Sequence, residues 1–174
     1  MLPALETSRL RLRPLTEADA PFILELVNDA AWLAYIGDKA VYTLDDALRY
    51  LREGPIAMYA TLGIGLCAMD LMEPEPRPVG LCGLLVREGS PEVELGYALL
   101  PEARGQGLMR EAALAWMAYG ERELKLREMH AYTHAENGAS QALLARVGFA
   151  LLPPAAPEDD PATVRRHWRL SFSA

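Results

Sequence analysis

The segment EVELGYALLPEARGQGLMREA, residues 92–112, constrains the fold of this chain more than any other segment. Its first half alternates apolar residues with polar or small ones, which is the two-residue period of a β-strand. Pro101 lacks an N–H group and ends regular strand pairing. The turn Arg104–Gly107 then leads into a predicted helix, whose unpaired N–H groups and positive dipole end suit an anion. A glycine turn before a helix can also be purely structural, so the flanking segments must decide between these two interpretations.

Length and composition indicate one ordered domain. The chain has 174 residues, which fits a single domain over residues 1–174, and 51% of them are hydrophobic, enough for a sizeable core. The formal net charge of −7 argues against a nucleic-acid partner, because general nucleic-acid binders are usually basic. A negative charge is compatible with a cationic substrate or partner. The sequence does not distinguish a monomer from a homodimer.

The cysteines and the hydropathy pattern indicate where the chain resides. Cys67 and Cys82 both lie inside apolar runs, so we expect buried free thiols in a reducing compartment rather than a disulfide. No stretch approaches the roughly 18 unbroken apolar residues of a membrane helix. The N-terminus also lacks the long apolar core of a signal peptide. We therefore expect a cytoplasmic protein without a membrane partner.

Periodicity and turn residues predict seven strands and about four helices. Strands are expected at residues 8–13, 65–72, 79–87, 92–99, 128–133, 149–152 and 164–172. Helices are expected after caps at Thr16, Thr43 and Asn137, and after Gly107. The three consecutive strands from 65 to 99 predict an antiparallel meander, whereas the helix between the fourth and fifth strands predicts that those two are parallel. The expected class is a three-layer α+β fold with a mixed, mostly antiparallel sheet.

Three segments leave room for more than one interpretation. The first strand carries arginines at alternate positions, Arg9, Arg11 and Arg13. This pattern favours a solvated strand face with salt bridges over a basic binding patch. Residues 28–42 are expected to be irregular, with aromatic side chains that either line a pocket or pack on the core. Gly54-Pro55 is expected to end the second helix, before a further helical turn at residues 56–62.

The histidines do not predict a metal site. His130 and His134 lie four residues apart across a strand and a loop, and His167 lies far along the chain. A zinc site would need more ligands with better spacing, so we expect no metal. No Ser-His-Asp or Cys-His pattern stands out either.

The order of elements, together with three motifs, resembles the GNAT superfamily of acetyltransferases. Within it, the chain is similar to the branch of ribosomal-protein N-terminal acetyltransferases, which includes alanine acetyltransferases. The motifs are ETSRLRLRPL at residues 6–15 with Asp19-Ala20 following, RGQGLM at 104–109 with Glu111-Ala112 following, and N-x-x-S at 137–140 with Gly148-Phe149 following. The second motif resembles the superfamily's acetyl-CoA motif. Together they span nearly the whole chain and imply a GNAT-like fold, with the fourth and fifth strands parallel and splayed.

The resemblance implies direct transfer of an acetyl group from acetyl-CoA, as co-substrate, to a primary amine. The backbone N–H groups of the turn would hold the CoA pyrophosphate, with Arg104 adding positive charge; the residues are Arg104, Gly105, Gln106, Gly107, Leu108 and Met109. In the family a bulge splays the fourth strand and frees backbone donors for the pantetheine and the thioester, which implies Tyr97, Ala98 and Leu99 here. These groups could instead simply pair with the fifth strand. Asn137 could bind the pantetheine amide as well as cap its helix.

Two side chains are candidates for the proton transfers. Glu94 lies on the polar face of the strand that leads to the site and is the candidate base, although it could be an ordinary strand carboxylate. Ser140 is the candidate acid for the CoA thiolate, because Leu144 occupies the place where many family members carry a tyrosine. Ser140 could instead serve only as part of the helix start. Met109 also departs from the family pattern, which usually has Gly or Ala there.

The function expected from this resemblance is acetylation of a protein N-terminal α-amine. One alternative is the same chemistry on a small amine: an amino acid, a polyamine or an aminoglycoside. Another alternative, of a different class, is a module that binds acyl-CoA without acetylating any amine. The segment 28–42 should select the acceptor, and its sequence does not reveal which one.

Overall fold

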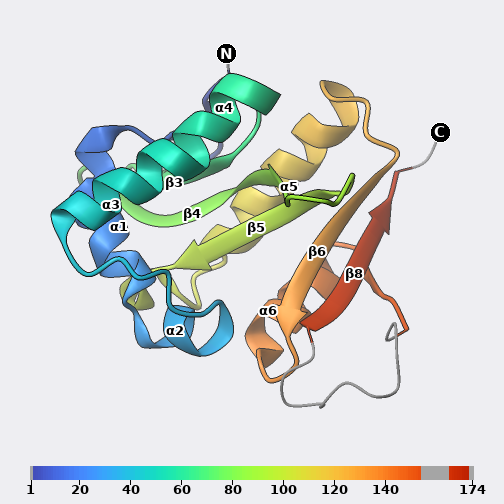
Figure 1. Cartoon of the computed structure of the whole chain (residues 1–174). Helices are drawn as coiled ribbons and strands as arrows, with labels where there is room; N and C mark the ends of the chain where they lie inside the picture. Colours follow the sequence, from blue (N-terminus) through green and yellow to red (C-terminus); the bar gives the residue numbers. More distant parts are fainter. Residues whose placement is uncertain (1, 154–164, 173–174) are drawn as a thin grey trace.

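The computed structural model describes residues 2–153 and 165–172, and its centre is an eight-stranded sheet in the order β1-β2-β3-β4-β5-β6-β8-β7 (Figure 1). The strands are β1 (Leu5–Glu6), β2 (Leu10–Pro14), β3 (Leu66–Leu71), β4 (Arg77–Val86), β5 (Val93–Leu99), β6 (Glu128–His134), β7 (Ala150–Leu151) and β8 (Arg165–Ser171). Val164, the expected first residue of the last strand, lies outside the described residues.

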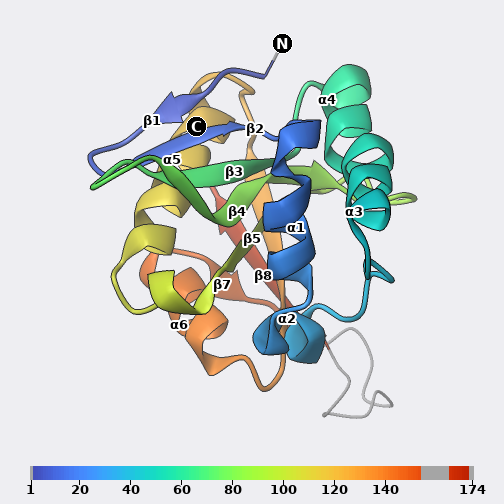
Figure 2. The same ribbon diagram turned by 90° about the vertical axis from the view of Figure 1, so that its left-hand side faces the viewer.

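Helices cover both faces of the sheet. The α-helices are α1 (Ala20–Val27), α2 (Ala30–Tyr35), α3 (Leu44–Leu51), α4 (Ala57–Leu62), α5 (Leu108–Arg122) and α6 (Gly138–Arg146), joined by shorter helical turns at Glu17–Asp19, Arg52–Ile56 and Pro101–Ala103. Figure 2 shows the sheet between α5 and α6 on one side and α1, α3 and α4 on the other. This is the predicted three-layer α+β arrangement.

The predicted strand pairing is confirmed. β3, β4 and β5 form an antiparallel meander, and β5 and β6 are parallel. The only register pair between β5 and β6 is Glu94 with His130, and beyond it the two strands diverge toward the end where α2 and α6 lie (Figure 1). The prediction of a bulge in β5 is wrong, because the register between β5 and β4 is continuous. An irregular register occurs instead between β3 and β4, at Met69/Asp70. The splay therefore comes from β6 leaving a regular β5.

Three details of the secondary structure differ from the prediction. The sheet has an eighth strand, β1, because the chain before β2 folds back and pairs Leu5 with Leu12. Residues 28–42 are not wholly irregular, since Asp29 accepts bonds from the N–H groups of Ala31 and Trp32 and caps the short helix α2. Pro55 does not end the second helix, because a π-helical turn accommodates it and α3 continues into α4.

Two buried clusters hold the layers together. The cluster on the α5 side contains apolar side chains of β4, β5, β6 and α5, among them the fully buried Trp116. The cluster on the α1 side contains Ile23, Leu51 and Leu81. Within the described ranges, no helix is long and apolar enough to cross a membrane.

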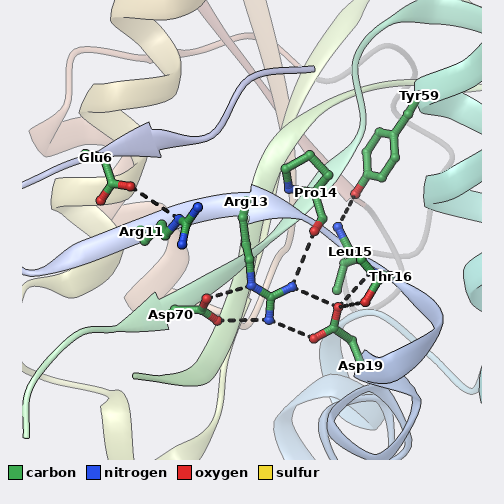
Figure 3. A network of polar contacts seen from close by, with 9 residues as sticks. All are labelled: Glu6, Arg11, Arg13, Pro14, Leu15, Thr16, Asp19, Tyr59 and Asp70. Atoms are coloured by element: carbon green, nitrogen blue, oxygen red, sulfur yellow. Dashed lines mark hydrogen bonds and ion pairs between the residues drawn. The ribbon is translucent and has the colours of Figure 1, made fainter. Parts of the chain in front are cut away.

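The arginines of β2 form ion pairs rather than a free basic patch. Arg11 pairs with Glu6, and Arg13 lies between Asp19 and Asp70, which come from the start of α1 and from β3 (Figure 3). Burial alone would raise the pKa of Asp19, but the hydrogen bonds and charge of Arg13 outweigh it and lower that pKa. Of the two interpretations of this strand, salt bridging is confirmed.

Candidate active site

The predicted anion turn has the backbone geometry of a ligand cradle. Gly105 and Gly107 have φ angles of +73° and +75°, a region that side chains other than glycine rarely adopt, and Gly107 is the N-cap of α5. Leu108 and Met109 follow with their side chains buried in the core beneath the turn. Met109 thus fills the core rather than the turn. The backbone N–H groups at the start of α5 are the groups that can meet an anion there.

Arg104 does not stand free in this turn. Its Nη2 lies 2.5 Å from Oδ2 of Asp29, and its guanidinium also donates to the carbonyl oxygen of Leu99 at 2.9 and 3.2 Å. Burial would raise the pKa of Asp29, yet Arg104 and the helix N–H groups lower it overall. Arg104 therefore ties the turn to the N-terminus of α2.

The backbone of β5 presents donors toward the splay. Leu100 N–H donates to Val79 of β4, whereas the Leu99 carbonyl accepts from Arg104 on the opposite edge. Because successive residues of a strand point their N–H and C=O groups to opposite edges, the N–H groups of Tyr97 and Leu99 face the edge that β6 has left. Ala98 belongs to the β4 edge. Two of the three predicted backbone donors thus face the splay.

Ser140 and Tyr97 form a hydroxyl pair across the splay. The Tyr97 Oη lies 2.7 Å from Ser140 Oγ, and Asn137 caps α6 by accepting the Ser140 N–H at 3.1 Å. Burial raises the pKa of Tyr97, an effect that the bond to Ser140 only partly offsets, so this phenol stays protonated at neutral pH. The predicted cap at Asn137 is confirmed, and the side chain of Tyr97 joins the predicted backbone donor as a polar group of the site.

Glu94 lies buried where β5 and β6 begin to separate. Its side chain is 4% exposed, and its two carboxylate oxygens lie 3.0 and 2.8 Å from Nε of Arg87. Arg87 is half exposed, so the ion pair leads from a buried carboxylate to the surface. Glu94 is therefore not an ordinary solvated strand carboxylate.

A cluster that the sequence did not indicate lies next to Glu94. His130 Nδ1 is 2.8 Å from His167 Nε2, and the carboxylate of Glu92 approaches each of these nitrogens to 3.8 Å. The Tyr132 hydroxyl donates to Glu92 at 2.7 Å, and its ring stacks on His167. Burial lowers the pKa of His167 below its ordinary value despite the opposing charge of Glu92. His167, far from His130 along the chain, lies beside it in space because β6 and β8 are adjacent antiparallel strands.

Helix α2 spans the open end of the splay. Asp29 at its start contacts Arg104 near β5, and Tyr35 at its end lies with its ring 5.7 Å from that of His134 at the end of β6. Trp32, between them, is buried in the α1-side core. Packing on the core is thus confirmed for Trp32, whereas Tyr35 contacts His134.

The two motifs of the resemblance that involve the N-terminus and α5 meet in space. The carboxylate of Glu111 accepts bonds from the Thr7 and Ser8 hydroxyls at 2.6 and 3.1 Å, and from the backbone and side chain of Arg9 at 2.9 and 2.8 Å. Arg9 also donates to the carbonyl oxygen of Gln106 at 3.0 Å. Although burial opposes it, this set of donors lowers the pKa of Glu111 to about 2. The N-terminal segment thus fixes the first turn of α5, and with it the cradle.

The site as a whole fits a long ligand that carries both phosphate and amide groups. The helix start suits a pyrophosphate, and the free edge of β5 suits amides. Glu94 and the Tyr97–Ser140 pair lie on opposite faces of β5, because side chains alternate along a strand. An extended ligand in the splay would therefore have a carboxylate on one side and hydroxyl groups on the other.

Comparisons with known proteins agree with this geometry. The family model described as acetyltransferase (GNAT) domain matches residues 9–150. YoaA of Bacillus subtilis strain 168, described as an uncharacterized N-acetyltransferase, is 28% identical over 152 residues, which are 86% of this chain and 84% of that protein. The crystal structure of an acetyltransferase from Agrobacterium tumefaciens str. C58 is 29% identical, with a TM-score of 0.80 over 99% of this chain and 96% of that one.

A second structure shares the fold alone. RimL, described as a ribosomal L7/L12 α-N-protein acetyltransferase in complex with coenzyme A, has a TM-score of 0.79 at 18% identity, over 98% of both chains. The family match extends over most of the chain and includes the turn, the splay and the N-x-x-S segment. The protein therefore belongs to the GNAT acetyltransferases and is an N-acetyltransferase.

Proposed function

We propose that this enzyme transfers the acetyl group of acetyl-CoA to the α-amine of a protein N-terminus. The observation that carries the proposal is the splay of β5 from β6 beyond Glu94 and His130, directly beside the start of α5. A net charge of −7 favours a basic acceptor protein, such as a ribosomal protein. Two buried free cysteines support a cytoplasmic location, where thiols stay reduced.

The pyrophosphate of acetyl-CoA binds the N–H groups of residues 105–109, and the pantetheine runs along the edge of β5. There the N–H groups of Tyr97 and Leu99 bind its amides and the thioester oxygen, while Asn137 reaches the pantetheine from α6. A donor aimed at the developing oxyanion is worth about 3 kcal/mol of transition-state stabilisation. These groups thus both position the thioester and stabilise the charge that forms on it.

Glu94 receives the proton of the acceptor ammonium, directly or through one water molecule. The neutral amine then attacks the thioester carbonyl, a C–N bond forms, and the C–S bond breaks. As the C–S bond breaks, the nitrogen loses its second proton to solvent. Ser140, held by the protonated Tyr97, donates a proton to the departing CoA thiolate and regains one from solvent. The two proton transfers take place on opposite faces of β5, so the base and the acid do not exchange protons with each other.

A small amine remains the second candidate acceptor, because α2 covers the open end of the splay and limits the space there. The test is acetyl-CoA turnover by the wild-type enzyme against peptides with alanine or serine N-termini, free amino acids, polyamines and aminoglycosides. Turnover with peptides at least tenfold above that with the small amines supports the proposal. Turnover confined to small amines establishes the second candidate. If no amine is acetylated, the remaining interpretation is a module that binds acyl-CoA without catalysis.

Glu94→Gln tests the role of the base. We expect kcat to fall about 100-fold while CoA affinity stays unchanged, because the carboxylate does not contact the cofactor. Glu88→Gln, in the exposed loop between β4 and β5, removes the same charge nearby and should leave the rate unchanged. An unchanged rate in Glu94→Gln would remove Glu94 from this role.

A further inference from the structure

Three residues with metal-ligating side chains converge on one face of the sheet. Glu92 precedes β5, His130 lies in β6 and His167 lies in β8, and their ligand atoms are all within 4.8 Å of one another. Side chains two residues apart on a strand share a face, so Glu92 lies on the face of Glu94, which pairs with His130. In the same way, His167 pairs with Tyr132, which is two residues from His130. Among the described residues, these three form the group of His, Cys, Asp and Glu side chains that could hold a metal ion.

The distances within this cluster suit a tetrahedral ion. The nitrogens of His130 and His167 are 2.8 Å apart, and each is 3.8 Å from an oxygen of Glu92. Zinc bonds of about 2.0–2.1 Å at tetrahedral angles place neighbouring ligand atoms roughly 3.3 Å apart. Small side-chain movements of roughly 0.5 Å would therefore bring all three atoms to one ion and leave a fourth position open.

The surrounding groups orient the ligands as in metal sites. The other nitrogen of His130, Nε2, lies 3.3 Å from the Glu128 carboxylate, so a proton on Nε2 leaves the Nδ1 lone pair facing His167 and Glu92. Glu92 accepts the hydroxyl of Tyr132, whose ring stacks on His167 with centroids 4.4 Å apart. Carboxylate and hydroxyl partners of this kind fix the tautomer and direction of ligands in metal sites.

The local charges permit a dication. Three carboxylates face the cluster, from Glu92, Glu94 and Glu128, and two guanidinium groups oppose them, since Arg87 pairs with Glu94 and Arg169 approaches Glu128 to 4.0 Å. His130 is 4% exposed and His167 about a quarter exposed, so the open side lies toward His167. Two imidazoles and one carboxylate select zinc-class transition ions over magnesium or calcium.

We propose that Glu92, His130 and His167 bind one divalent transition-metal ion of the zinc class, with a fourth position open to water. Because His130 is the register partner of Glu94, the bound ion lies beside the residue proposed to deprotonate the acceptor. A dication there repels the acceptor ammonium, and the site therefore inhibits acetyl transfer when it is loaded. This second consequence rests on the proposed function, whereas metal binding itself does not.

The test uses the full chain without a histidine tag, titrated with ZnCl2 by calorimetry and with CoCl2 by visible absorption. We expect one ion per chain and the d–d bands of four-coordinate cobalt in the wild type. Tyr132→Phe removes a hydrogen bond to the ligand Glu92 and should weaken zinc binding about tenfold. His167→Gln removes a ligand itself, so zinc binding should weaken by more than the roughly 10–100-fold typical of losing a group that only hydrogen-bonds a ligand. His134 lies in β6, as His130 does, but outside the cluster, so His134→Gln should bind zinc as the wild type does.

Retained CoA affinity in each variant shows that it is folded. Absence of zinc binding by the wild type, or equal binding by His167→Gln, overturns the site. Zinc should also inhibit acetyl transfer by the wild type but not by His167→Gln. If binding occurs as expected without any inhibition, the site stands and its regulatory consequence fails; if no amine is acetylated at all, only the proposed function fails.

Discussion

Two polar clusters lie on the same sheet and differ in how completely their groups are paired. Around Arg13, all five N–H donors of the guanidinium meet oxygens of Asp19, Asp70 and the Pro14 carbonyl, at 2.6–3.3 Å (Figure 3). In the cluster of Glu92, His130 and His167, two imidazole nitrogens face each other and share one hydrogen bond, with carboxylate oxygens 3.8 Å away.

The difference separates a structural network from one with unused binding capacity. A partly buried charge with every donor paired holds β2, β3 and α1 in place and has no group left for a ligand. The second cluster, in which one hydrogen bond joins two imidazoles and carboxylate oxygens lie 3.8 Å away, retains lone pairs that an ion or a substrate can satisfy. Loss of the first cluster should therefore affect stability, and loss of groups near the second should affect binding or rate.

The largest expected effect is that of Arg13→Met. It leaves the buried carboxylates of Asp19 and Asp70 without their cation, which costs about 3–5 kcal/mol of unfolding free energy. Urea denaturation measures this. Arg11→Met removes an exposed pair of the same strand and should cost less than about 1 kcal/mol. Equal losses in the two variants would contradict a structural role specific to the Arg13 network.

Ser140→Ala should affect rate rather than stability. We expect kcat to fall about 100-fold, equivalent to roughly 2.7 kcal/mol, because the thiolate loses its proton donor. CoA affinity by calorimetry and the urea midpoint should stay close to wild type. Tyr97→Phe should lower kcat less, since Ser140 would remain. A loss of stability with unchanged kcat would assign Ser140 to the helix start alone.

The smallest effect is expected from Glu111→Gln, and it depends on pH. The fall of the Glu111 pKa from 4.5 to about 2 corresponds to roughly 3 kcal/mol, of which the variant should lose about 2 because the amide oxygen keeps some bonds. Since the pKa is depressed in the folded state, this stabilisation is present above pH 4.5 and is lost as the pH falls through about 2. Urea unfolding of both proteins across this range should show their difference shrinking toward acid pH; a constant difference would contradict it.

The sequence predicted those parts of the molecule that depend on local pattern. The meander, the parallel pair and the caps at Thr16, Thr43 and Asn137 followed from periodicity and capping residues. Helix α2 was missed because six residues are too few to show a helical period, although Asp29 provided a cap. The strand β1 was missed because two residues form a strand only where the edge of β2 is available.

The site was predictable where it lies in continuous motifs and not where it depends on strand register. Gly107 and Asn137 could be placed from their own neighbours in sequence. The contact of His130 with His167 joins residues 37 positions apart, and only the pairing of β6 with β8 brings them together. The alternation of His130 and Tyr132 along one face of β6 was the available signal, but their partners on β8 could not be read from it.

The most direct test of the account is calorimetry of coenzyme A binding to the wild type, Gly107→Glu and Gly63→Glu. Gly63 ends α4 at a φ of +69°, close to the +75° of Gly107, so the two variants carry the same backbone strain and the same added charge. We expect the wild type and Gly63→Glu to bind coenzyme A alike, and Gly107→Glu to show no detectable binding. Absence of binding by the wild type, or equal binding by all three proteins, would contradict the assignment of this turn as the coenzyme A cradle.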